Sequence, residues 1–94
     1  MAEVTQQFLE DQGYTHVRQM ENGEWIGVSR FIYTYGLCIG LDQFGYARRY
    51  CYEFSIHAII AAKEYKGEGD PSGPWIKQKG EGIERLGPGV KNDT

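Results

Sequence analysis

The stretch 31–54 constrains the fold most, because β-branched and aromatic residues crowd together there around turn-forming residues. Leu37, Ile39 and Leu41 alternate with small residues, which is the period-two pattern of a β-strand. A glycine-containing loop at 42–45 separates this strand from a second, aromatic one. The stretch therefore predicts a β-hairpin.

The residues before this hairpin predict a short helix and two further strands. Apolar residues at helical spacing indicate an amphipathic helix over 2–12, and Gly13 stands where a helix-ending glycine belongs. The segments 16–20 and 25–32 have strand character and flank Asn22-Gly23, the strongest short-range signal for a hairpin turn.

After the hairpin, the sequence predicts a helix over 56–66, with Ser55 as its N-cap. This segment is apolar nearly all round, so we expect the helix to be heavily buried. Residues 67–94 hold seven of the 13 glycines and all three prolines, and we expect regular structure largely to stop there. Within this tail the apolar residues at 75–77 predict a brief edge strand or an anchor.

Together these elements predict an α+β fold, an antiparallel β-meander of about four strands packed by two helices on one face, with a Gly/Pro-rich C-terminal tail. A chain of 94 residues is the size of one domain. We expect a single α+β domain over 1–86 and a loose C-terminal end over 87–94.

Charge and hydropathy bear on partners and location. The net charge of −3 provides no overall field that would attract nucleic acid. The sequence shows no basic-then-apolar leader and no apolar stretch of the roughly 18–20 residues that a bilayer span needs. We therefore expect a cytoplasmic protein with no membrane partner.

Few residues carry recognisable catalytic or metal-binding chemistry. Cys38 and Cys51 fall on the two strands of the predicted hairpin, and in a cytosolic protein we expect buried free thiols, with a disulfide or metal pair as the alternative. His16 and His57 lack the closely spaced second ligand of a zinc motif. No acid–base pair or activated nucleophile can be assembled, so we predict no enzyme activity, no metal and no cofactor.

An aromatic and basic stripe is the main candidate binding surface. On one face of the second hairpin strand stand Tyr46, Arg48, Tyr50 and Tyr52, with Arg49 on the other face and Tyr33 and Tyr35 on the neighbouring strand. Such a stripe can fill the core beneath a helix, form a protein interface, or stack the bases of a single-stranded nucleic acid. The sequence leaves these three interpretations open.

Trp75 is the second candidate, because it is the one aromatic residue of the tail and offers its largest apolar area. It either docks on the body and anchors the tail, or it stays exposed as an interface hot spot flanked by Lys77 and Lys79.

Four stretches of the chain resemble small uncharacterised proteins of bacteriophages and prophages: Gln-Gly-Tyr-Thr-His-Val-Arg at 12–18, Gly-Glu-Trp-Ile-Gly-Val at 23–28, Arg-Arg-Tyr-Cys-Tyr at 48–52 and Gly-Pro-Trp-Ile-Lys at 73–77. The resemblance implies an accessory protein that acts stoichiometrically on a host protein. We therefore expect a small protein-binding module whose host partner is unidentified; the alternative is a single-stranded nucleic-acid binder that uses the aromatic and basic strand.

Overall fold

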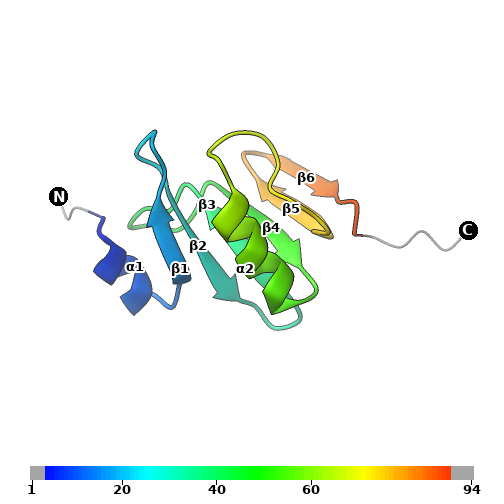
Figure 1. The fold of residues 1–94 in the computed structure, drawn as a ribbon, viewed down its shortest axis with the longest axis horizontal. Coiled ribbons are helices and arrows are strands. Elements are labelled where there is room, and N and C mark those ends of the chain that lie inside the picture. The colour runs from blue at the N-terminus through cyan, green and yellow to red at the C-terminus, as the bar shows by residue number, and fades with distance from the viewer. Residues whose placement is uncertain (1–3, 90–94) are drawn as a thin grey trace, which may run out of the picture.

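The computed structural model describes residues 4–89, which form one antiparallel sheet of six strands and two helices (Figure 1). The strands follow one another in chain order across the sheet, so the α+β class and the meander are confirmed, while the expected four strands fall short by two. The elements are α1 (Gln6–Asp11), β1 (Thr15–Gln19), β2 (Trp25–Arg30), β3 (Tyr35–Ile39), β4 (Arg48–Tyr52), α2 (Ser55–Glu64), β5 (Lys77–Gly80) and β6 (Ile83–Leu86).

Helix α1 and the first hairpin form for the local reasons that the sequence suggested. The Thr5 hydroxyl caps α1 by accepting the Phe8 N–H at 3.1 Å, and Gly13 follows the helix with a φ of 101°. Gly23 has a φ of 91° in the β1–β2 turn, which is closed by a 2.7 Å bond from the Met20 N–H to the Glu24 carbonyl. Helix α1 is shorter than the predicted 2–12, of which residues 2 and 3 lie outside the described part of the chain.

The central hairpin of β3 and β4 confirms the strongest prediction. Leu37 pairs with Tyr50 across it, and the connecting loop turns at Asp42. The Asp42 carboxylate accepts the N–H groups of Phe44 at 2.7 Å and Gly45 at 3.0 Å, as an aspartate in an Asx turn does.

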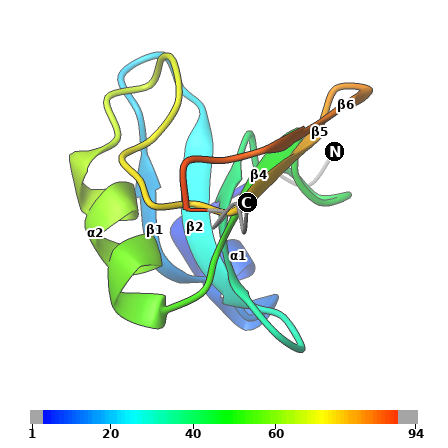
Figure 2. The same ribbon diagram turned by 90° about the vertical axis from the view of Figure 1, so that its right-hand side faces the viewer.

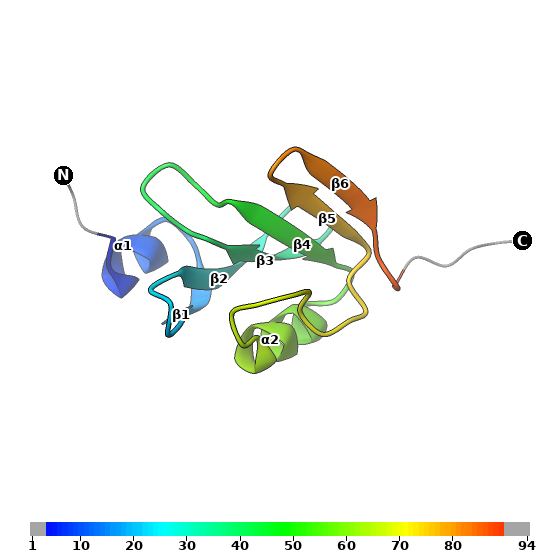
Figure 3. The ribbon, with the colours of Figure 1, turned by 90° about the horizontal axis from the view of Figure 1, so that it is seen from above.

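The two helices cover opposite faces of the sheet (Figures 2 and 3), so the expectation that both lie on one face is wrong. Alternate residues of β2, β3 and β4 point toward α2 and form the main core, including Ile26, Leu37 and Tyr50. On the other face Leu9 of α1 packs in a smaller cluster that includes Cys38. Both faces of β3 are apolar, and each therefore takes a helix.

Helix α2 buries only its alanine side. Ala58, Ala61 and Ala62 face the sheet, whereas Ile56 and Ile60 are exposed, so the expected burial on all sides is wrong. Small residues suit this contact because the large side chains of the sheet already fill the space between the layers. No helix in the described part of the chain is long and apolar enough to cross a membrane.

The tail forms a β5–β6 hairpin that was not predicted from the sequence. Strands β5 and β6 pair directly, joined by Glu81 and Gly82 with φ angles of 54° and 75°. Two positive φ angles in a two-residue connection define the type I′ hairpin turn, which a Glu-Gly pair signals more weakly than Asn-Gly. A Cβ at Gly80 would lie 2.2 Å from the Ala47 carbonyl oxygen, so the close approach of β5 to β4 requires glycine there.

The connector between α2 and β5 is held by the core. The Tyr50 hydroxyl donates to the Asp70 carboxylate at 2.7 Å, and the Tyr52 hydroxyl donates to the Ser72 carbonyl at 2.7 Å. Trp75 is 4% exposed and packs edge-on against Tyr50, with ring centroids 5.0 Å apart, which confirms its role as the tail anchor.

The segment 87–89 runs back along the start of β5. The N–H groups of Gly87 and Gly89 donate to the carbonyls of Ile76 and Trp75, each at 3.0 Å. The rest of the predicted loose end, 90–94, lies outside the described residues.

Removing the Tyr50 side chain should destabilise the fold strongly. Tyr50 is fully buried, so we expect Tyr50→Ala to lower the free energy of unfolding by about 3–5 kcal/mol. Tyr33 is 90% exposed, and Tyr33→Ala should change it by less than about 0.5 kcal/mol. Denaturant midpoints measure both effects, and equal midpoints for Tyr50→Ala and the wild type would contradict the burial.

The Asp70 contacts should make stability depend on acid pH. Hydrogen bonds from Arg85 and Tyr50 hold the pKa of Asp70 below its usual value of 3.8. A group with a lower pKa in the folded state stabilises the protein above the unfolded pKa and loses this contribution as the pH falls through the folded pKa. The stability advantage of the wild type over Asp70→Asn should therefore be full at pH 7 and shrink below about pH 4. An advantage that urea unfolding finds unchanged down to pH 2 would count against this coupling.

Candidate functional site

Strand alternation divides the predicted aromatic and basic stripe between the two faces of the sheet. Tyr50 and Tyr52 face α2 and are fully buried, and Tyr35 is half-buried against the same core. With Trp75 also in this core, these four predicted residues have little or no side-chain surface to offer a partner.

Arg48 lies on the α2 face as well, and its guanidinium is used internally. It donates to the Tyr50 hydroxyl at 3.1 Å, to the Tyr65 hydroxyl, and to the Gly69 carbonyl at 3.4 Å. Burial, together with the hydrogen bond to Asp70, raises the pKa of Tyr50 to about 12, so this hydroxyl stays protonated as a donor. Arg48 is therefore part of the packing between β4 and the connector.

The remaining predicted residues come together on the opposite face. Arg49 pairs with Lys79, and Cys51 pairs with Lys77, directly across β4 and β5. They line a groove of about 350 Å³, here called the β4–β5 groove, whose full lining is Phe31, Ile32, Tyr33, Thr34, Arg49, Cys51, Ile76, Lys77 and Lys79. Tyr46, the last predicted residue, stands next to Arg49.

Aromatic rings hold Arg49 in place. Its guanidinium lies 4.3 Å from the ring centroid of Phe31 and 5.6 Å from that of Tyr46, within the range of cation–π attraction. Phe31 in turn packs closely against Gly36, where a Cβ would be 2.3 Å from the ring. The Arg49 Nε is buried without a hydrogen-bond partner among the described residues. A fixed positive charge thus stands in the groove wall.

The rim of the groove combines charge with exposed apolar surface. The Lys77 ammonium bonds to the Glu84 carboxylate at 2.7 Å. This hydrogen bond, with the charges of Lys77 and Lys79, lowers the pKa of Glu84. Ile32 and Tyr33 are 88% and 90% exposed at the β2–β3 turn. The groove is therefore cationic and partly apolar.

Sequence reasoning missed Phe31, Ile32, Cys51 and Glu84 as members of this site. The period-two rule could have grouped Cys51 with Arg49, because both point away from the Tyr50 face. Glu84 could not be placed without the β5–β6 hairpin.

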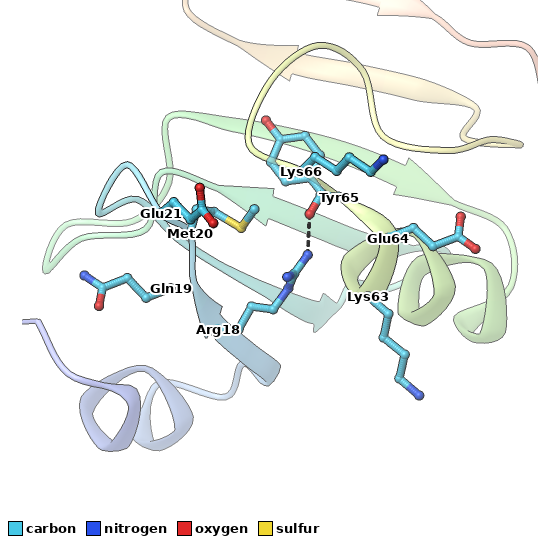
Figure 4. A pocket seen from close by; sticks show the side chains of 8 residues that line it. All are labelled: Arg18, Gln19, Met20, Glu21, Lys63, Glu64, Tyr65 and Lys66. Carbon is cyan, nitrogen blue, oxygen red and sulfur yellow. Dashed lines mark hydrogen bonds between the residues drawn. The ribbon is translucent and has the colours of Figure 1, made fainter.

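Two other surfaces are weaker candidates. A larger hollow of about 780 Å³ lies between β1 and the end of α2 (Figure 4). Its lining mixes acids with bases, and its Arg18 is engaged in capping α2, with bonds to the Ala62 carbonyl at 2.9 and 3.1 Å and to the Tyr65 carbonyl. The exposed side of α2 carries the apolar side chains of Ile56 and Ile60. Neither shows the ordered charge of the β4–β5 groove.

The thiols are free and buried. Burial raises the pKa of Cys38 to about 12, so this thiol stays protonated at neutral pH and is a poor nucleophile. Within 4–89, no group of three or more potential metal ligands comes together.

The sequence matches no protein-family model, and comparisons with curated proteins and with solved structures give no match. The resemblance to phage and prophage proteins therefore stays a prediction. What the protein does has to be argued from the β4–β5 groove itself.

The two cysteines should differ in reactivity. Cys51 lines the groove, whereas Cys38 is fully buried in the cluster under α1 and has a raised pKa. In the native protein at pH 8, a small neutral thiol reagent should modify Cys51 before Cys38, as mass spectrometry of the labelled peptides can show. The single variants Cys38→Ala and Cys51→Ala provide the assignment, and faster labelling of Cys38 would argue against this arrangement.

Proposed function

We propose that this protein is a small protein-binding module that acts by occupying a partner's surface through the β4–β5 groove. The observation that carries the proposal is the pair of large apolar side chains, Ile32 and Tyr33, held almost fully exposed beside a groove with an ordered arginine. Exposed apolar surface of this kind is covered in a complex, and Tyr and Arg supply much of the binding energy in protein interfaces.

The composition of the groove supports binding over catalysis. Its lining residues include three cations and one thiol, and none of them is a carboxylate or an imidazole. General acid–base catalysis draws most often on the imidazole of histidine or on a carboxyl group, and this lining contains neither. The resemblance to phage and prophage proteins favours a host protein in the cytoplasm as the partner, bound stoichiometrically.

The same geometry supports single-stranded nucleic-acid binding less well. Tyr50 and Tyr52, on which that alternative depended, lie in the core. The Phe31 ring already contacts the Arg49 guanidinium and Gly36, so less of its surface is left for stacking with a base. Among the groove aromatics, Tyr33 alone has a widely exposed ring.

A pull-down from nuclease-treated bacterial lysate tests the proposal with three forms of the tagged protein. The wild type and Phe44→Ala, which changes an exposed residue outside the groove, should retain the same partner band. The double variant Ile32→Ala/Tyr33→Ala should lose it, because losing hot-spot contacts worth about 2 kcal/mol or more weakens binding roughly 30-fold. Equal retention of the partner by all three forms would refute the groove as the contact. A partner band that appears with untreated lysate and is lost after nuclease treatment would point to nucleic acid.

A further inference from the structure

We propose that the β4–β5 groove receives an acidic segment of the partner protein, with a carboxylate between Arg49 and Lys79 and a neighbouring apolar side chain against Ile32 and Tyr33. This inference rests on the proposed protein-binding function and names the chemistry of its partner. Glu84, which bonds to Lys77 and lies opposite Lys79, is in this arrangement an internal competitor for the lysines of the groove.

Two like charges face each other across β4 and β5. Arg49 and Lys79 are directly opposite each other on the same face of the sheet. Directly opposed residues have Cβ atoms about 4.5–5.5 Å apart, and like charges in that position destabilise a sheet. An anion between them would turn this repulsion into two attractions.

Arg49 also has unused hydrogen-bonding capacity. Its Nε is buried and has no partner among the described residues, although Phe31 and Tyr46 hold the guanidinium in place. Stacking on aromatic rings satisfies the charge in part, but it leaves the N–H donors of the guanidinium without acceptors. A carboxylate accepts from an arginine in a short, charge-assisted bond.

Glu84 shows that this face of the sheet already binds a carboxylate. It bonds to Lys77 at 2.7 Å and lies opposite Lys79. Glu84 stands on β6, two strands from Arg49 on β4, which is a backbone separation of about 9.5 Å. The Glu84 carboxylate therefore neutralises the lysines near β6, and Arg49 remains available to a carboxylate of another molecule.

The apolar lining of the groove favours an apolar residue next to the carboxylate in the partner segment. A purely acidic segment would bury little of the apolar surface of Ile32, Tyr33 and Ile76, whereas an adjacent side chain the size of leucine would cover it. A groove of about 350 Å³ is at the small end of ligand sites, which suits a short segment.

The test uses the fluorescently labelled peptide acetyl-Glu-Glu-Leu-Glu-Glu-amide and fluorescence anisotropy at low salt. We expect wild-type protein to bind it more tightly than a peptide with glutamine in place of every glutamate, and more tightly than one with serine in place of leucine. Lys79→Gln should weaken binding of the acidic peptide about two- to fivefold, the size of one exposed ion pair. Glu84→Gln should strengthen it by a similar factor, because Lys77 is released.

Lys63→Gln, on α2 and away from the groove, is the matched charge control and should leave the affinity of the acidic peptide unchanged. Absence of binding, equal affinity for the acidic and glutamine peptides, or weaker binding by Glu84→Gln would overturn the inference. Tighter binding of labelled decathymidylate would replace it with a nucleic-acid ligand. If the lysate partner depends on Ile32 and Tyr33 while the acidic peptide fails to bind, the proposed function stands and this inference falls.

Discussion

The hydroxyl groups of Tyr50 and Tyr52 hold the connector between α2 and β5 in place, in a part of the chain where the sequence has no local signal for a helix or strand. Both rings are fully buried beneath α2, and a buried hydroxyl without a partner would cost about 1–3 kcal/mol. Both find their partners in the connector, one at Asp70 and one at the Ser72 carbonyl. A segment rich in glycine and proline, which has no helix or strand of its own, is thereby given a fixed path.

The fixed connector sets up everything that follows it in the chain. It brings Trp75 into contact with Tyr50 and leads directly into β5. Just before that strand, the Ile76 N–H donates to the Cys51 carbonyl at 2.8 Å. Strand β6 then returns Arg85 to Asp70 at 2.5 Å, with its guanidinium 5.2 Å from the Trp75 ring centroid. These contacts link the connector, β5 and β6 to one another. The tyrosine hydroxyls hold the connector in place, and the lysines of β5 therefore lie beside Arg49.

The sequence predicted the elements whose signals are local. Alternation of apolar residues, Asn22-Gly23 and Gly13 led to four strands and two helices in the right order. The β5–β6 hairpin was missed because its stability comes from contacts with residues far away in the chain, including Gly80 against Ala47 and Asp70 with Arg85. Such contacts leave no periodic pattern in the tail itself.

The face on which each helix lies could not be predicted for a different reason. Strand β3 carries Leu37 toward one helix and Cys38 toward the other, so hydrophobicity alone does not distinguish the two sides. The candidate site was predicted only in part for the same reason. Arg49, Tyr33, Lys77 and Lys79, which line the β4–β5 groove, were among the candidates, but the candidates also included core residues such as Tyr52.

The neighbouring arginines of β4 show why we propose the groove, and not the stripe as a whole, as the binding surface. Arg48 points toward α2 and is surrounded by oxygen acceptors, so its charge and its donors are used within the fold. Arg49, one residue later, points to the other face, where it meets aromatic rings and a lysine. The first arrangement is complete without a ligand, because oxygen acceptors already surround the guanidinium. The second keeps a rigid cation whose Nε is buried and has no hydrogen-bond partner among the described residues, and we propose that a carboxylate from another molecule pairs with this guanidinium.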